Sequence, residues 1–199
     1  MIRIKKLENL EATVRVPGSK SYTQRALVIA SLADGESILR HALISEDTHL
    51  LVDALRSFGA VISVCDTDIR VLGTAGTIRN PRRALRLGNN GTALRFLTTL
   101  AALAKGEVIL DGGPRLRQRP LQPLLDVLRG LGVSCRSMDG NGCPPVAVEG
   151  GGFQGGRGVF TDARSSQYIS SLLIGAPYAR NDVTVELRGE TASLPYIEM

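Results

Sequence analysis

The chain has 199 residues, of which 43% are hydrophobic and 22% are charged, as is typical of a folded domain with a substantial core. A net charge of +5 favours anionic partners, but scattered basic residues and few aromatic side chains argue against nucleic-acid binding. Because its three cysteines form no CxxC pair and its apolar stretches are shorter than a membrane span, we expect a reduced, cytoplasmic protein without membrane segment, metal or cofactor.

The same order of elements recurs along the chain, which indicates an internal repeat. Each copy has a short strand, small polar residues, an apolar helix, a turn, a second strand and an amphipathic helix that ends near Gly. The first copy begins with VRVPGSKS and predicts helices around 23–33 and 47–58. The second begins with ALRLGNNGT and predicts helices at 92–104 and about 119–131.

The third copy is incomplete. It begins with GVFTDARSSQ, predicts an apolar helix at 167–176 and a strand in VTVELRG, and reaches only the start of another helix in SLPYIEM. Pro195 suits a first helical turn and Ser193 could cap it, so the pattern predicts a helix whose body is missing. A domain of two and a half repeats with a short tail is the alternative.

The apolar helices predict where a ligand binds. ALVIASLA, ALRFLTTLAALA and YISSLLIGA are apolar around most of the helical wheel, so they should be surrounded by protein. If the copies are related by pseudo-threefold symmetry, these helices run parallel and their amino ends emerge together. Unpaired N–H groups and the positive ends of three dipoles would then form an anion site.

The segment PGSKS, followed by Arg25, suits an anionic substrate. Lys20 offers a compact cation, Ser21 is a plausible helix cap, and Arg25 lies one turn further on, where its guanidinium can bind a carboxylate. A capped helix with two solvated charges would show the same pattern.

The segment LGNNGTALR places Asn89, Asn90 and Gly91 just before the second apolar helix. Glycine lets backbone N–H groups approach a ligand closely, although an ordinary turn into a helix explains the pattern too. Arg95 falls on an almost wholly apolar helix, so it is either the partner of a buried carboxylate or a site residue.

Arg115, Arg117 and Arg119 lie close together at the expected start of a helix, where positive charges oppose the helix dipole unless an anion compensates them. This favours a ligand over a solvated basic loop. The segment ARSSQY brings two hydroxyl groups and an amide to the third apolar helix, which suits phosphate oxygens, although any Ser-rich cap looks alike.

Five segments in order resemble the signature segments of EPSP synthase, an enolpyruvyl transferase family: VPGSKSYTQRAL, LGNNGTALRFL, RQRPLQPLLDVLRGLG, ARSSQYISSLLIGAP and SLPYIEM. The resemblance covers nearly the whole chain. It implies an α/β (α+β) fold of repeated βαβαββ units around parallel buried helices, here with a truncated third unit. It also implies transfer of the enolpyruvyl group of phosphoenolpyruvate to shikimate 3-phosphate.

The resemblance also assigns residues by motif. Lys20 would be catalytic, touching the phosphate of phosphoenolpyruvate and the attacking 5-hydroxyl. Shikimate 3-phosphate would be held by Lys20, Ser21, Arg25, Ser165, Ser166, Gln167, Ser193 and Tyr196. Phosphoenolpyruvate would be held by Lys20, Asn89, Gly91, Arg119 and Gln167.

Members of the family are about twice as long as this chain, and their second domain supplies further catalytic groups. By analogy, residues 1–16 would form a strand of that second domain, 17–199 the N-terminal domain, and the C-terminal domain would be absent. Such a chain should bind substrate without turnover. Asn90 and Phe96 stand where the family commonly has Ala and Pro, which leaves glyphosate sensitivity open.

Three other functions compete with this one. The transferase acting on UDP-N-acetylglucosamine shares the fold but uses a loop cysteine that LRQRP lacks. A non-catalytic module that binds a phosphorylated metabolite is the second, and an RNA-processing relative with similar repeats, whose histidine signature is missing, is the third. The sequence has no GxxxxGK[ST] loop and no nucleophile triad, which argues against a kinase or hydrolase.

Overall fold

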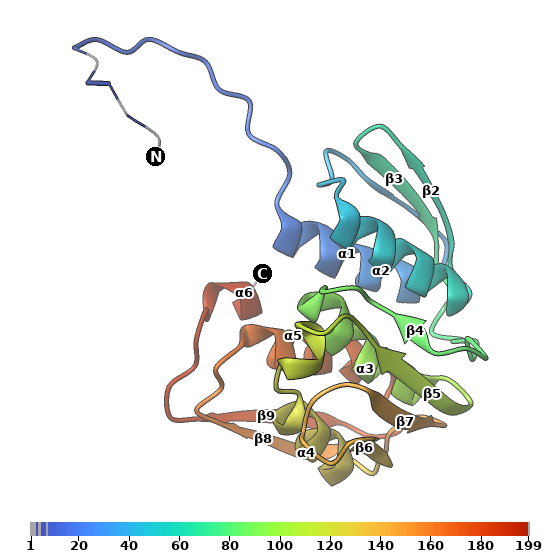
Figure 1. Cartoon of the computed structure of the whole chain (residues 1–199). Coiled ribbons are helices and arrows are strands. Elements are labelled where there is room, and N and C mark those ends of the chain that lie inside the picture. The colour runs from blue at the N-terminus through green and yellow to red at the C-terminus, as the bar shows by residue number, and fades with distance from the viewer. Residues whose placement is uncertain (1–2, 4, 7, 199) are drawn as a thin grey trace.

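A computed structural model describes residues 3, 5–6 and 8–198, which fold as three related units of helices and strands (Figure 1). The first unit comprises α1 (Lys20–Leu32), β1 (Glu36–Leu39), α2 (Glu46–Ser57), β2 (Val61–Cys65) and β3 (Asp68–Leu72). The second comprises β4 (Leu85–Arg86), α3 (Gly91–Leu103), β5 (Gly106–Asp111), the 3-10 helix η1 (Leu116–Gln118), α4 (Gln122–Gly130), β6 (Cys135–Ser137) and β7 (Val146–Gly150). The third comprises β8 (Gly156–Thr161), α5 (Ser166–Gly175), the 3-10 helix η2 (Ala176–Tyr178), β9 (Val183–Arg188) and α6 (Pro195–Glu198).

The second unit has the complete βαβαββ order, and each unit contributes its own sheet. The strand orders are β1-β3-β2, β4-β5-β7-β6 and β8-β9. In the second and third units the strands that flank the inner helix pair in parallel, β4 with β5 and β8 with β9. The first unit lacks the equivalent strand: VRV, at 14–16, is exposed and joins no sheet in the described part of the chain. The predicted strand there has no partner.

The three inner helices α1, α3 and α5 run parallel, as the repeat predicted. Near their amino ends, Gln167 of α5 donates a hydrogen bond to Thr92 of α3, at 3.0 Å. Further towards the carboxyl ends of both helices, Ser171 of α5 contacts Thr99 of α3. α5 also runs parallel to α1. Arg25 of α1 donates a hydrogen bond to Ser170 of α5, and further along both helices Tyr178, just beyond α5, donates to the carbonyl of Leu32 at the end of α1. All three amino ends therefore lie at one end of the domain.

Burial differs among the inner helices. α3 is surrounded by protein on nearly every side, as predicted. α1 and α5 are not fully covered, since Ile29 and Leu173 are 53% and 41% exposed and line a groove between the two helices. The outer helices α2 and α4 pack away from this groove, whereas on the side of the groove the chain supplies only the single turn of α6. Within the described ranges, no helix is long and apolar enough to cross a membrane.

Two antiparallel hairpins, β2–β3 and β6–β7, are each followed by a segment that binds the carboxyl end of an inner helix. The N–H groups of Gly151 and Gly152, just after β7, donate to the carbonyl of Ala102 in α3. Thr74, just after β3, donates in the same way to the carbonyl of Ser31 in α1. Carbonyls of the last turn, which have no partner within a helix, are thereby satisfied by the chain itself. The sequence pattern did not predict these hairpins.

Candidate functional site

Each inner helix begins at a capped amino end. Ser19, Asn90 and Ser165 are the caps, and the side-chain oxygen of each accepts a hydrogen bond from a backbone N–H of the first turn. The prediction that Ser21 caps the first helix is wrong by two residues, because the helix starts at Lys20. Lys20 and Ser21 thus lie within the first turn, next to unpaired N–H groups and the positive end of the dipole.

Lys20 forms an ion pair with Asp47, which stands in the first turn of α2. The backbone carbonyl of Asp47 also accepts a hydrogen bond of 2.8 Å from the side-chain amide of Asn90. One aspartate therefore connects the start of α2 to the starts of α1 and α3. The sequence pattern did not identify Asp47, because an acidic residue in a first helical turn is ordinary dipole compensation.

Arg25 is a buried cation with 7% exposure. Its Nη2 donates to Ser170 Oγ at 3.0 Å and its Nη1 donates to the carbonyl of Ser21 at 3.3 Å. The guanidinium lies over the rings of Phe96 and Tyr196, at 5.3 and 5.4 Å from their centroids. Burial lowers the pKa of Arg25, and Tyr196 opposes that shift. No described carboxylate neutralises this charge, so an anionic ligand is its natural counterion.

Two further guanidinium groups converge on Gly91, at the start of α3. A Cβ atom built on Gly91 would lie 2.6 Å from Nη1 of Arg119 and 2.7 Å from Nη1 of Arg95. Neither arginine is paired with a carboxylate among residues 3, 5–6 and 8–198. Two like charges this close repel each other unless an anion lies between or beside them. The prediction that Arg95 might pair with a buried carboxylate is therefore wrong.

Gln167 connects α5 to α3 on the same side. Its amide oxygen accepts from Arg95 Nη1 at 3.0 Å and its amide nitrogen donates to Thr92 Oγ1 at 3.0 Å. Both polar atoms of the side chain are thus engaged within the protein. Arg95 also stacks over the ring of Tyr168, at 5.1 Å, and this holds its guanidinium under the start of α3.

The arginine run lies around the short 3-10 helix η1 and not at the start of α4, which corrects the prediction for 115–119. Arg119 follows η1 in an extended conformation, and α4 begins only at Gln122. Arg117 is compensated within the chain by Asp111, whose carboxylate accepts from Arg117 Nε at 2.8 Å and from Nη2 at 2.6 Å. The ligand argument from crowded charge therefore applies to Arg119 and not to Arg117.

The pair with Arg117 also affects how Asp111 titrates. Hydrogen bonds from Arg117 hold the pKa of Asp111 below its usual value, although burial acts in the opposite direction. A carboxyl with a lowered folded-state pKa stabilises the fold above its unfolded pKa, and that stabilisation is lost as pH falls through the folded value. The pair should therefore remain intact across neutral and mildly acidic pH.

The remaining predicted residues lie on α5 and around α6. Ser165 is the cap of α5, and Ser166, the first residue of that helix, is buried. Tyr196 lies above Arg25, and its carbonyl accepts a hydrogen bond from Ser170. The prediction that Ser193 caps the last helix is wrong, because its φ of 60° is left-handed and its carbonyl instead accepts from the N–H of Tyr196. The exposed Asn89 lies beside Gly113.

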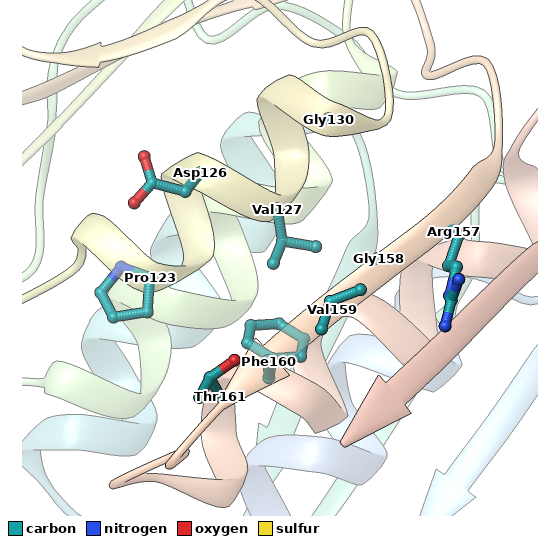
Figure 2. A pocket seen from close by; sticks show the side chains of 9 residues that line it. All are labelled: Pro123, Asp126, Val127, Gly130, Arg157, Gly158, Val159, Phe160 and Thr161. Atoms are coloured by element: carbon teal, nitrogen blue, oxygen red, sulfur yellow. The ribbon is translucent and has the colours of Figure 1, made fainter. Parts of the chain in front are cut away.

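A separate pocket lies between α4 and β8 (Figure 2). Its walls include Pro123, Asp126 and Val127 of α4 and Arg157 and Phe160 of β8. Asp126 is already bonded to Arg129, and Arg157 to Glu186, so neither charge is free to attract a ligand. The pocket contains none of the predicted site residues, and we place no function there.

The fold and the site together define the class of protein. Repeated βαβαββ units direct three inner helices, with Lys20, Arg25 and Arg119 at their amino ends, into one cationic site. This arrangement defines an α/β protein with a cationic site whose charge suits a small, multiply charged anion.

Comparison with known proteins identifies the family. The chain belongs to the EPSP synthase (3-phosphoshikimate 1-carboxyvinyltransferase) family, whose model matches residues 4–199. A 3-phosphoshikimate 1-carboxyvinyltransferase of Methanothermobacter thermautotrophicus is 45% identical over 198 residues, which is 100% of this chain and 46% of that protein. A relative of the same name from Rhizobium etli strain CFN 42 is 45% identical over 185 residues, 92% of this chain and 44% of its own length.

Solved structures agree with this family. EPSP synthase from Acinetobacter baumannii superposes with a TM-score of 0.83 at 26% identity, over 93% of this chain and 42% of that one. The chain thus spans about half the length of the curated relatives it matches.

Proposed function

We propose that the whole protein transfers the enolpyruvyl group of phosphoenolpyruvate to the 5-hydroxyl of shikimate 3-phosphate, releasing phosphate, and that this chain carries the half-site for shikimate 3-phosphate. The observation that carries the proposal is the convergence of Arg25, Arg95 and Arg119, without paired carboxylates in the described chain, on three helix amino ends. Shikimate 3-phosphate has both a phosphate and a carboxylate, so it suits a site with several separated cations.

The residues divide between the two substrates. Arg25 and Ser21 bind the shikimate carboxylate, and Lys20 donates to the 5-hydroxyl. Ser165, Ser166 and Gln167 at the start of α5 face the phosphate. Two residues from the last turn complete this set, namely Ser193 and Tyr196. Phosphoenolpyruvate is bound by Lys20, Asn89, Gly91, Arg119 and Gln167. Gln167 bonds α3 through one N–H and one lone pair of its amide, so its second N–H and second lone pair can still bind a ligand.

The chemistry needs a cation beside the reacting oxygen. The 5-hydroxyl adds to C2 of the protonated enolpyruvate, and the tetrahedral adduct then loses phosphate. Lys20 stabilises the phosphate charge and lies near the attacking hydroxyl, and its ion pair with Asp47 fixes the ammonium group in place. The proton donor and acceptor belong to a second domain of the kind that the longer family members carry.

The chain by itself should therefore bind and not turn over. Its free thiols Cys65, Cys135 and Cys143 suit the reducing cytoplasm, where we place the enzyme. The alternative transferase for UDP-N-acetylglucosamine is not proposed, because the loop at 115–120 contains no cysteine.

Titration calorimetry tests this proposal. We expect shikimate 3-phosphate to bind the chain, and Lys20→Met to weaken that binding about tenfold through loss of one charge-assisted contact. Lys105→Met is the matched control, because Lys105 is exposed just beyond the opposite end of α3, and it should bind as the parent does. No phosphate should be released when phosphoenolpyruvate is added. Absence of shikimate 3-phosphate binding, or turnover by this chain alone, would contradict the proposal.

Gly91→Ala is expected to weaken phosphoenolpyruvate binding about tenfold and to leave shikimate 3-phosphate binding within about twofold of the parent. The new methyl group would overlap the guanidinium groups of Arg119 and Arg95 and push them aside, without backbone strain, because Gly91 lies in α3 and has no positive φ. NMR titration of phosphoenolpyruvate into the chain saturated with shikimate 3-phosphate measures the effect. Gly130→Ala, where a Cβ meets nothing within 4 Å, is the control. Equal binding by the Gly91 variant and the parent would show that Arg119 is not held there.

A further inference from the structure

The loop that carries Arg119 begins at a buried carboxylate outside the proposed binding set. Asp111 is the last residue of β5 and is 5% exposed. Its Oδ1 accepts from the N–H of Gly112 at 2.7 Å and from Arg117 Nε at 2.8 Å, and its Oδ2 accepts from Arg117 Nη2 at 2.6 Å. A two-pronged pair of this kind fixes the direction of both side chains, in contrast to a single surface contact.

The same loop is fastened at two further points. The N–H of Gly113 donates to the carbonyl of Gly88 at 2.6 Å, and the side chain of Leu116 is completely buried. The N–H of Arg119 then donates to the carbonyl of Leu116 at 2.9 Å. Arg119 itself is exposed and has no carboxylate partner in the described residues, so its position depends on the loop and on its contact with Gly91.

The ion pair of Asp111 with Arg117 also reduces the positive charge of the loop. Without Asp111, the loop would present three cations within five residues, and their mutual repulsion would favour an open loop. Neutralising Arg117 leaves Arg119 directed at the start of α3 and Arg115 exposed on the outside. Exposed ion pairs contribute little to stability, but Asp111 is not exposed, and its pair acts on a short loop with a ligand-binding residue at its end.

We propose that Asp111 is a positioning residue, which holds the 112–119 loop through Arg117 so that Arg119 meets phosphoenolpyruvate. This inference rests on the proposed function and deepens it. Asp111 touches no substrate in this scheme. Its removal should therefore affect one substrate and spare the other, whereas a merely structural residue would affect both.

The test uses NMR on the whole chain, with the Nε–H signals of Arg119 and Arg25 as separate reporters. Shikimate 3-phosphate is added first, and its effect on Arg25 is recorded; phosphoenolpyruvate follows, and its effect on Arg119 is recorded. For Asp111→Asn we expect the dissociation constant for phosphoenolpyruvate to rise about tenfold, with that for shikimate 3-phosphate unchanged. Arg117→Ala should give the same loss, and the double variant should be no worse than either single one, because both remove one interaction.

Arg115→Ala is the matched control, since it removes an equal charge from the same loop at an exposed residue without an ion pair in the described chain. It should bind both ligands as the parent does. Equal loss in Arg115→Ala, joint loss of both ligands in Asp111→Asn, or parent-like binding in Asp111→Asn would overturn the inference. The inference would also be overturned if phosphoenolpyruvate did not shift the Arg119 signal of the parent chain. Failure of shikimate 3-phosphate to shift Arg25 in the parent would instead contradict the proposed half-site for shikimate 3-phosphate.

Discussion

Arg25→Ala is expected to abolish measurable binding of shikimate 3-phosphate. The guanidinium is oriented by Ser170 and by the carbonyl of Ser21, contacts two aromatic rings, and is largely shielded from water. Truncating one partner of a buried, hydrogen-bonded charge pair costs about 2–5 kcal/mol, so the dissociation constant should rise by more than about thirtyfold. Titration calorimetry at neutral pH, with the parent chain run alongside, measures the change.

The Arg25 prediction separates binding from folding. Because Arg25 has no carboxylate partner in the described chain, its removal leaves no buried anion unpaired, and the urea midpoint should stay near that of the parent. Arg25→Lys keeps a positive charge but loses the planar fork, so it should bind at an intermediate level. Arg56→Ala, on the far end of α2, should bind normally. Parent-like affinity in Arg25→Ala would remove the central cation from the proposed site.

Gly150→Ala is expected to cause the largest loss of stability, about 2–3 kcal/mol in the free energy of unfolding. A Cβ at Gly150 would collide with the backbone carbonyl of Ala104 and lie 2.7 Å from that of Ala101, at the carboxyl end of α3. Backbone atoms cannot rotate away as a side chain can, so β7 or α3 must shift. Urea unfolding followed by circular dichroism gives the difference from the shift of the midpoint.

Gly130→Ala again serves as the control, because it is the same substitution at an open position at the end of α4. It should be neutral or slightly stabilising, since alanine favours a helix by up to about 1 kcal/mol over glycine. Gly73→Ala should resemble Gly150→Ala, because a Cβ there meets the carbonyls of Ala30 and Ala33 at the end of α1. If Gly150→Ala unfolds at the parent's midpoint, the close approach is not a constraint on the fold.

Local pattern was enough to predict the inner helices and their parallel packing. The prediction of 92–104 compares with Gly91–Leu103 in the structure, and that of 167–176 with Ser166–Gly175. The hairpin of β2 and β3 was implied only by the βαβαββ units of the family resemblance. The residue pattern did not locate it, since its strands are short and its turn at Asp66 lacks the usual glycine, although Asp66 adopts a left-handed φ of 50°. Strand pairing depends on distant neighbours, which a single segment does not reveal.

The candidate site was predictable where one segment contains the whole signal. Lys20 and Gly91 stand at helix starts that the sequence marks with small polar residues, and Arg25 lies one turn further along α1. Their partners were not predictable, because Asp47 meets Lys20 only once α2 packs beside α1. The role of Arg117 was misread for another reason: its partner Asp111 is only six residues earlier, but the pair forms because the loop after β5 turns back on itself.

The contacts between α1 and α5 have a consequence for synthesis in the cell. Arg25 and Ser170 are 145 positions apart, and Leu32 and Tyr178 are 146 apart, so both contacts close very long loops. Such contacts form late, because closing a long loop costs chain entropy before the contact contributes any stabilisation. While the ribosome is still translating the second unit, the nascent chain has Arg25 without Ser170 beside it. During that interval the apolar flank of α1 around Ile29 has no α5 to pack against.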